Sequence, residues 1–202
     1  LKLVDTCKGE RCMSKIDSIV DIGLEQFRIN GYNNVNVKQI CEKANISRAT
    51  FYSYFSGKQD LILYKLKAIR SSLEMSVESF AVAANDFERM WIILEKFLDT
   101  FRCFGAKLGK TVWELELENA GDLFNFTNMF NAWFVQLVRN CQCQGIIQNQ
   151  TDPEELVKIG IDLAIGTTVR WSIMDGGFDL NDVVRKCMEG IYDLKPEYRS
   201  KI

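Results

Sequence analysis

Cationic and hydroxyl-bearing side chains gather in residues 36–58, at spacings that suit nucleic-acid recognition. Arg48 is followed directly by Ala49, and Lys38 precedes them. An arginine can donate two hydrogen bonds to O6 and N7 of a guanine, while a small neighbour can touch a thymine methyl group. Lys38 has the reach for a base or a phosphate. Hydroxyl groups lie close by, at Ser47, Thr50, Tyr52 and Tyr54.

Isolated lysines and arginines are usually solvated surface, so these residues matter only if a suitable element holds them. The sequence predicts such an element. Asn36 can cap a short helix over 37–44 with Ile40 and Cys41 facing inward. Asn45 then tolerates the left-handed turn region, and Ser47 can cap a second helix over 48–54. A helix, a tight turn and a second helix form a helix-turn-helix, whose second helix enters the major groove.

Helical periodicity extends over nearly the whole chain. A first helix over 14–30 carries an apolar stripe and ends at Asn30-Gly31, where glycine suits a left-handed position. Asp152, followed by Pro153 and two glutamates, marks another helix start. The chain has 2 prolines and no strand-like alternation. We therefore predict an all-α fold of about nine helices, the remaining ones at 58 up to Phe80, 86–103, 107–119, 123–144, 152–174 and 179–194.

The stretch from Ile19 to Leu61 resembles the DNA-binding domain of the TetR/AcrR family of regulators. The matching positions form a spaced pattern without a gap: Ile19, Phe27, Gly31-Tyr32, Val37, Ile40, Ala44, Ile46-Ser47, Thr50-Phe51-Tyr52, Tyr54-Phe55 and Lys58 to Leu61. The departures keep the physical roles of the usual residues. Gly23 stands where alanine is usual, Asn45 where glycine is usual, and Phe51 where leucine is common.

The resemblance implies two domains and a DNA-binding role. Residues 1–57, ordered from about residue 14, would form the three-helix DNA-binding domain, and residues 58–202 a helical effector-binding and dimerisation domain. Thr50, Tyr52 and Tyr54 would contact phosphates and base edges, and Lys58 would pair with a backbone phosphate. Phe51 and Phe55 are expected in the core. The full set of expected DNA contacts is Asn36, Val37, Lys38, Ser47, Arg48, Ala49, Thr50, Tyr52, Tyr54 and Lys58.

The last two predicted helices each present an apolar face. In the family such a pair packs against its twin as a four-helix bundle, so the resemblance implies a homodimer on double-stranded operator DNA. Any amphipathic helix shows such a face, however, and the alternative is an ordinary core within one chain. The residues assigned to the dimer interface are Leu156, Gly160, Leu163, Ala164, Thr167, Trp171, Val184, Cys187 and Ile191.

Residues 86–144 are rich in large apolar side chains, which predicts either a filled core or a cavity for an apolar or aromatic effector. One of Glu114, Glu116 and Glu118 could instead pair with a cationic amphipathic ligand. Alternate acids on a helix cannot all face one way, so at least one should be solvated. The residues assigned to the effector pocket are Trp91, Phe101, Trp113, Phe130 and Trp133.

The distribution of charge favours binding to a polyanion, and the composition argues against an enzyme. Residues 1–70 carry 12 Lys or Arg against 7 Asp or Glu, whereas the other 132 residues carry 13 against 20. A basic segment on an acidic body suits a polyanion-binding module. The chain has no histidine, no Gly-rich phosphate loop and no nucleophile elbow, so we expect neither an enzyme nor a cofactor.

The predicted function is a ligand-responsive repressor in the cytoplasm, without a transmembrane helix or signal peptide. One alternative is a DNA-bound adaptor whose C-terminal domain binds a protein instead of a small ligand. Another is redox or metal sensing through Cys141 and Cys143, although a zinc site usually needs four ligands and we expect no metal. Reduced thiols are the default for the 7 scattered cysteines.

Overall fold

The computed structural model describes residues 14–74, 83–119 and 122–200, with the backbone alone for Arg70, 72–74, Asn119 and 122–130. The chain divides into two compact units, residues 1–65 and 66–202. The described residues are helical, with a single isolated bridge between Ile147 and Leu194. The predicted all-α class is confirmed. None of the described helices is both long and apolar enough to cross a membrane.

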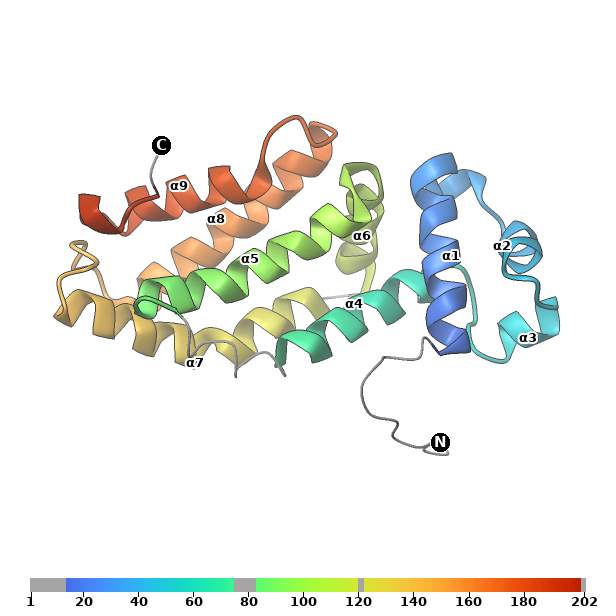
Figure 1. Cartoon of the computed structure of the whole chain (residues 1–202), viewed down its shortest axis with the longest axis horizontal. Helices are drawn as coiled ribbons and strands as arrows, with labels where there is room; N and C mark the ends of the chain where they lie inside the picture. Colours follow the sequence, from blue (N-terminus) through green and yellow to red (C-terminus); the bar gives the residue numbers. More distant parts are fainter. Residues whose placement is uncertain (1–13, 75–82, 120–121, 201–202) are drawn as a thin grey trace. The chain divides into compact units, whose positions relative to one another are not determined.

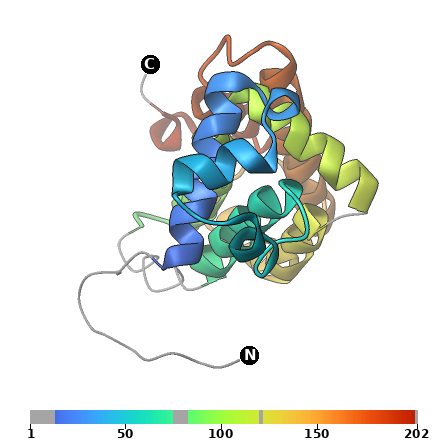
Figure 2. The same cartoon turned by 90° about the vertical axis from the view of Figure 1, so that its right-hand side faces the viewer.

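The first unit contains one long helix, a shorter helix packed against it, and a third, very short helix beside the second (Figures 1 and 2). Its elements are α1 (Lys15–Asn30), the 3-10 turn η1 (Tyr32–Asn34), α2 (Val37–Ala44), α3 (Arg48–Tyr52) and the start of α4 (Gln59–Glu74). α1 packs against both η1 and α2, and α2 against α3. The predicted extension of α4 to Phe80 lies outside the described residues.

Capping fixes where α1 begins and ends. Ser14 Oγ accepts a hydrogen bond from the Asp17 amide at 3.1 Å, and the Asp17 carboxylate accepts one from the Ser14 amide at 3.1 Å. This reciprocal capping box satisfies two of the free amides at the helix start. Gly31 ends the helix at a φ of 82°, which glycine adopts without strain. Both predicted ends of α1 are therefore confirmed within a residue.

In the described part of the second unit, five helices follow α4. They are α5 (Asp86–Phe104), α6 (Ala106–Asn119), α7 (Asp122–Cys143), α8 (Pro153–Ile173) and α9 (Leu180–Ile191). α8 packs against α6, α7 and α9, while α5 packs against α6, α7 and α9. Figure 1 shows α8 and α9 running side by side in opposite directions, joined by a short loop. The Asp152 and Asp179 caps predicted from the sequence are present.

Two predicted helices are shorter in the structure, for local reasons. α3 ends at Tyr52 and not at Tyr54, because the Tyr54 and Phe55 amides both donate to the Phe51 carbonyl and turn the chain. α9 ends at Ile191 and not at Leu194. Asp193 there has a left-handed φ of 47°, and the chain continues into the bridge with Ile147.

One nearly buried cation ties α5 to α9. Arg185, whose side chain is 12% exposed, donates to Glu88 at 3.0 Å and to Glu189 at 2.7 Å. Its guanidinium also lies 4.8 Å from the Phe87 ring and 5.0 Å from the Trp91 ring. A charge taken out of water is stable only when it is paired, and here two carboxylates already pair with the Arg185 guanidinium.

Two glycines of α8 face different surroundings. A Cβ atom at Gly160 would lie 2.5 Å from the Tyr192 hydroxyl oxygen and 3.3 Å from Met188 Cε. Tyr192 is buried, and its hydroxyl donates to the Leu156 carbonyl at 3.3 Å. At Gly166 nothing lies within 4 Å of such an atom. Close packing of α8 on its own chain's Tyr192 therefore depends on glycine at 160 but not at 166.

Alanine at these two positions should have opposite effects. Gly160→Ala should lower the free energy of unfolding by about 1–3 kcal/mol, because the new methyl group overpacks a buried site. Gly166→Ala should raise it by up to about 1 kcal/mol, because alanine favours the helix and meets no neighbour. Urea unfolding followed by circular dichroism measures both. Equal effects of the two substitutions would contradict the packing described here.

Candidate nucleic-acid interface

The turn between α2 and α3 has the geometry that a helix-turn-helix requires. Asn45 lies in the left-handed region at φ 51° and ψ 49°, and its amide donates to the Cys41 and Glu42 carbonyls. The prediction of a left-handed turn at Asn45 is confirmed. Ser47 then begins α3, since its hydroxyl accepts a hydrogen bond from the Thr50 amide at 3.0 Å.

Aromatic side chains beneath α3 anchor the helix. Phe51 and Phe55 are buried, as expected, with ring centroids 5.4 Å apart. Tyr64 of α4 meets Phe55 edge-on at 6.2 Å. Edge-to-face and tilted aromatic pairs at these distances are favourable beyond their burial. The inner side of α3 is therefore packed, and its other side chains face outward.

The outward face of α3 carries the residues predicted to meet DNA. Arg48, Ala49, Tyr52 and Tyr54 are exposed, and the two tyrosines are 55% and 46% exposed. Thr50 is half-buried, and its hydroxyl lies 2.9 Å from Ser47 Oγ. The two tyrosine hydroxyl groups and the Arg48 guanidinium are therefore open to solvent and can donate hydrogen bonds to a partner.

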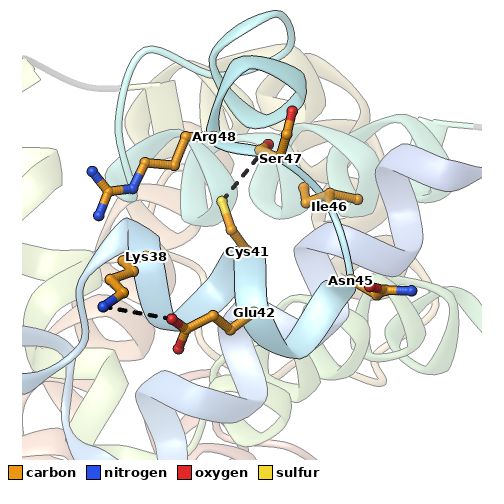
Figure 3. Close-up of a pocket in the computed structure, with 7 residues that line it drawn as sticks. All are labelled: Lys38, Cys41, Glu42, Asn45, Ile46, Ser47 and Arg48. Atoms are coloured by element: carbon orange, nitrogen blue, oxygen red, sulfur yellow. Dashed lines mark hydrogen bonds and ion pairs between the residues drawn. The ribbon is translucent and has the colours of Figure 1, made fainter.

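A shallow hollow of about 430 Å³ lies between α2 and α3 (Figure 3). Arg48 and Lys38 extend toward the same side of it, whereas Asn45 points away. Lys38 lies 3.7 Å from Glu42 in an exposed ion pair, and the described residues place no carboxylate on Arg48. The buried Cys41 thiol forms the floor, 4.0 Å from the Ser47 carbonyl, and burial raises its pKa. The hollow therefore offers cations at its rim and a neutral floor.

Asn36 and Val37 begin α2 at the edge of the same surface. The Asn36 side chain accepts a hydrogen bond from the Gln39 amide at 3.0 Å, and the Gln39 side chain accepts one from the Asn36 amide at 2.8 Å. Asn36 is exposed and Val37 is half-buried. The Asn36 carboxamide oxygen is thus used by the helix, while its NH₂ group faces solvent.

Lys58 has internal partners that the sequence did not suggest. Its ammonium donates to the Tyr32 carbonyl at 2.7 Å and to the Val35 carbonyl at 2.9 Å, and it lies 4.2 Å from the Tyr32 ring. Burial lowers the pKa of Lys58. The lysine therefore connects the loop around η1 to the start of α4, in addition to any phosphate contact. The Lys38–Glu42 pair, by contrast, was readable from its four-residue spacing.

The structure brings together only part of the expected effector pocket. Phe101 of α5 and Trp113 of α6 stack with centroids 4.9 Å apart and planes 12° apart. Trp91 lies instead against Arg185, and Trp133 on α7 meets Phe134 at 5.6 Å. The Phe130 side chain lies outside the described residues. Glu116 is buried while Glu114 and Glu118 are exposed, so the expectation that at least one acid is solvated is confirmed.

Most residues assigned to the dimer interface face the chain's own core. Leu156, Gly160, Ala164, Thr167, Trp171 and Val184 are buried within a single chain. Leu163, Cys187 and Ile191 are half-buried. A side chain already covered by its own unit has little surface left for a second copy. A contact with a twin would therefore rely on the half-buried members of this set and on neighbouring exposed positions of α8 and α9.

The cysteine pair is not arranged as a metal or redox site. Cys141 is buried and Cys143 is exposed, as expected for residues two apart on a helix. Burial raises the pKa of Cys141 to about 12, so its thiol stays protonated and unreactive near neutral pH. The described residues hold no cluster of three or more His, Cys, Asp or Glu side chains suited to a metal ion.

Comparison with known proteins gives one family match and several relatives. Residues 19–64 match the model of bacterial regulatory proteins of the tetR family. The chain is 22% identical over 189 residues to the fatty acid metabolism regulator protein of Bacillus subtilis (strain 168), covering 89% of this chain and 96% of that protein. The segment that matches the family model, residues 19–64, contains both α2 and α3.

Two solved structures share the fold over nearly the whole chain. A TetR/AcrR-family transcriptional regulator from Thermobifida fusca superposes with a TM-score of 0.68 at 18% identity, covering 92% of this chain and 99% of that one. The transcriptional regulator FadR from Bacillus subtilis, in complex with stearoyl-CoA, gives 0.62 at 20% identity, covering 87% and 96%. At these identities the likeness establishes the fold alone.

Removal of the Lys58 ammonium should destabilise the first unit. Lys58→Met keeps the aliphatic stem but leaves the Tyr32 and Val35 carbonyls without their donor, so the free energy of unfolding should fall by about 1–3 kcal/mol. Lys43→Met, at an exposed lysine of α2, should leave it within about 0.5 kcal/mol of the starting value. Urea unfolding measures both. Unchanged stability of Lys58→Met would mean that the internal contacts contribute nothing.

Proposed function

We propose that this chain, whose residues 19–64 match the model of bacterial regulatory proteins of the tetR family, is a transcriptional regulator of that family. It would be a repressor that binds a palindromic operator as a homodimer and is released by an acyl-group effector. The observation that carries the DNA-binding part is the outward face of α3. Arg48 projects there without a carboxylate partner among the described residues, beside Ala49 and the exposed Tyr52. Such a face is free to meet base edges.

The residues around Arg48 fall into two groups, one that would read bases and one that would position the helix on the duplex. Arg48 and Tyr52 are assigned to sequence reading, together with Lys38. Lys38 is held by Glu42 only through an exposed ion pair, which contributes about 0–1 kcal/mol and can exchange for a phosphate at little cost. Contacts from Asn36, Val37, Ser47, Thr50, Tyr54 and Lys58 would set the position of the helix on the duplex, and Ala49 could touch a thymine methyl group.

The relatives and the composition of the second unit support an acyl effector. The Bacillus subtilis relative is named for fatty acid metabolism, and the FadR structure contains stearoyl-CoA. α5 and α6 of this chain present large apolar side chains to one another, including the stacked pair Phe101 and Trp113. A long hydrocarbon chain suits such surroundings, because its transfer from water gains about 0.8 kcal/mol per buried CH₂ group.

Exposed apolar residues on α8 support a homodimer. Ile159, Ile173 and Met174 are large apolar side chains that remain open to solvent in one chain. Gly190 of α9 has nothing within 4 Å of a would-be Cβ, so another backbone can approach it. A twin packed on these outward faces would cover the exposed residues and would also reach the half-buried Leu163, Cys187 and Ile191.

The DNA-binding proposal is tested by selecting genomic fragments with the purified full chain and measuring affinity by fluorescence anisotropy over a salt series. We expect a short palindrome and a steep fall in affinity with salt, since phosphate contacts release counterions. Arg48→Ala should weaken operator binding about tenfold to a hundredfold and relax one base position. Addition of lauroyl-CoA should lower operator affinity.

An exposed arginine elsewhere in the unit is the matched control. Arg28→Ala removes an equal charge at the end of α1, where the guanidinium pairs with Glu25, and should change operator affinity by less than about threefold. Weak, sequence-independent binding by the unmodified chain would contradict the operator proposal. If both arginine variants lost the same operator affinity, Arg48 would contribute only its positive charge and no base recognition.

The homodimer is tested by size-exclusion chromatography with light scattering at micromolar concentration. The chain should elute at twice its 23.2 kDa mass. Ile159→Asp combined with Ile173→Asp should shift it to a monomer, because two charges would be buried unpaired in the interface. Ile29→Asp is the control, since Ile29 on α1 is as exposed as Ile173, at 66%. A single-chain mass for the unmodified protein would contradict the dimer.

A further inference from the structure

Among the buried hydrogen-bond donors of the second unit that have no partner in the described residues, two belong to uncharged side chains. They are the indole Nε1–H of Trp113 on α6 and the hydroxyl of Ser172 on α8. Ser172 is 1% exposed, and the Trp113 nitrogen is itself shielded from solvent although its ring is half-buried. An unsatisfied buried donor costs about 1–3 kcal/mol, so native proteins rarely keep one without a use for it.

The two donors border the same aromatic ring. A Cβ atom at Gly109 of α6 would lie 2.7 Å from Ser172 Oγ and 4.0 Å from Cδ1 of Phe101. Trp113 is one helical turn beyond Gly109 and stacks on Phe101 at 4.9 Å. Ser172 and Trp113 therefore approach the Phe101 ring from α8 and α6. Glycine at 109 is what leaves room for the Ser172 hydroxyl there.

The charges in this unit decide what the two donors can accept. Both are neutral, and no Lys or Arg described in residues 66–202 is fully buried. Arg185 is committed to Glu88 and Glu189, and Lys110 forms an exposed pair with Asp175. The acid Glu116 is buried on the same helix as Trp113. A buried carboxylate would lack a counter-charge here, whereas an uncharged carbonyl oxygen needs only donors.

We propose that Trp113 and Ser172 hold the carbonyl oxygen of an acyl thioester, and that they select the thioester over the free fatty acid. This inference rests on the proposed acyl effector and names the groups that recognise it. The Trp113 N–H and the Ser172 O–H donate to the oxygen, with the Phe101 ring beside it. The acyl chain continues among apolar side chains, and the charged remainder of the ligand stays in water.

Isothermal titration of the full chain with lauroyl-CoA, laurate and coenzyme A, each below micellar concentration, tests the proposal. We expect lauroyl-CoA to bind at least about tenfold more tightly than laurate or coenzyme A. Trp113→Phe keeps a ring that can stack, and Ser172→Ala removes one oxygen. Each should weaken lauroyl-CoA binding about fivefold to tenfold, by the loss of one hydrogen bond. Neither should change the affinity for laurate.

Stability separates this role from a structural one. With no partner to lose, Ser172→Ala should leave the Tm of the unliganded protein unchanged or raise it. The matched controls remove donors that already have partners. Trp171→Phe removes the indole N–H that donates to the Phe178 carbonyl at 3.0 Å, and Thr168→Val removes the hydroxyl that donates to the Ala164 carbonyl at 2.7 Å. Both should lower the Tm and leave lauroyl-CoA affinity within about twofold.

The outcomes distinguish this inference from the proposal beneath it. If lauroyl-CoA binds but Trp113→Phe and Ser172→Ala bind it equally well, the carbonyl assignment is overturned and the acyl effector stands. The same holds if both variants lower the Tm without changing affinity, since a buried water would then satisfy the donors. Equal binding of laurate overturns the selectivity. If the unmodified chain binds operator DNA but not lauroyl-CoA, both the proposed acyl effector and the proposed carbonyl contact are wrong.

Discussion

Helix α3 is only five residues long, and isolated helices shorter than about 12 residues are marginal in water. Its position therefore comes from what lies beneath it. Phe51 and Phe55 are buried together, Tyr64 meets Phe55 edge-on, and the Ser47 hydroxyl accepts the hydrogen bond of the Thr50 amide. Because the Phe51 side of the helix is packed, Arg48, Ala49 and Tyr52 lie on the side that faces solvent. The exposed face that can meet DNA is thus a consequence of aromatic burial on the opposite side of the same turn.

Local chemistry made the DNA-binding unit predictable. The ends of α1 and α2 follow from Ser14, Gly31 and Asn36, and the turn follows from Asn45, all of which act within four residues of themselves. Lys58 was different. Its carbonyl partners at Tyr32 and Val35 lie 26 and 23 residues away, and no periodicity or spacing encodes a contact of that range. The resemblance suggested only the outward half of that residue's role.

In the second unit the sequence predicted where the helices lie, but it did not predict which residues cover their apolar faces. An apolar stripe on α8 shows that the stripe must be covered, but not whether its own chain or a twin covers it. Gly160 illustrates the difference. The resemblance assigned it to contact with a second copy, whereas Tyr192 of the same chain lies against it. Charge pairing was equally hidden, because Arg185 and Glu88 are 97 residues apart.

The pairing of Arg185 bears on how an effector can act. An effector shifts a regulator between states only by as much as it binds one of them better. Since Arg185 is already neutralised by Glu88 and Glu189, an acidic ligand gains no new ion pair from it without breaking an existing one. The Trp113 and Ser172 donors differ from Arg185, because they have no hydrogen-bond partner among the described residues. They cost free energy in the unliganded chain, so under the proposed carbonyl contact an acceptor gains hydrogen bonds there without breaking an existing pair.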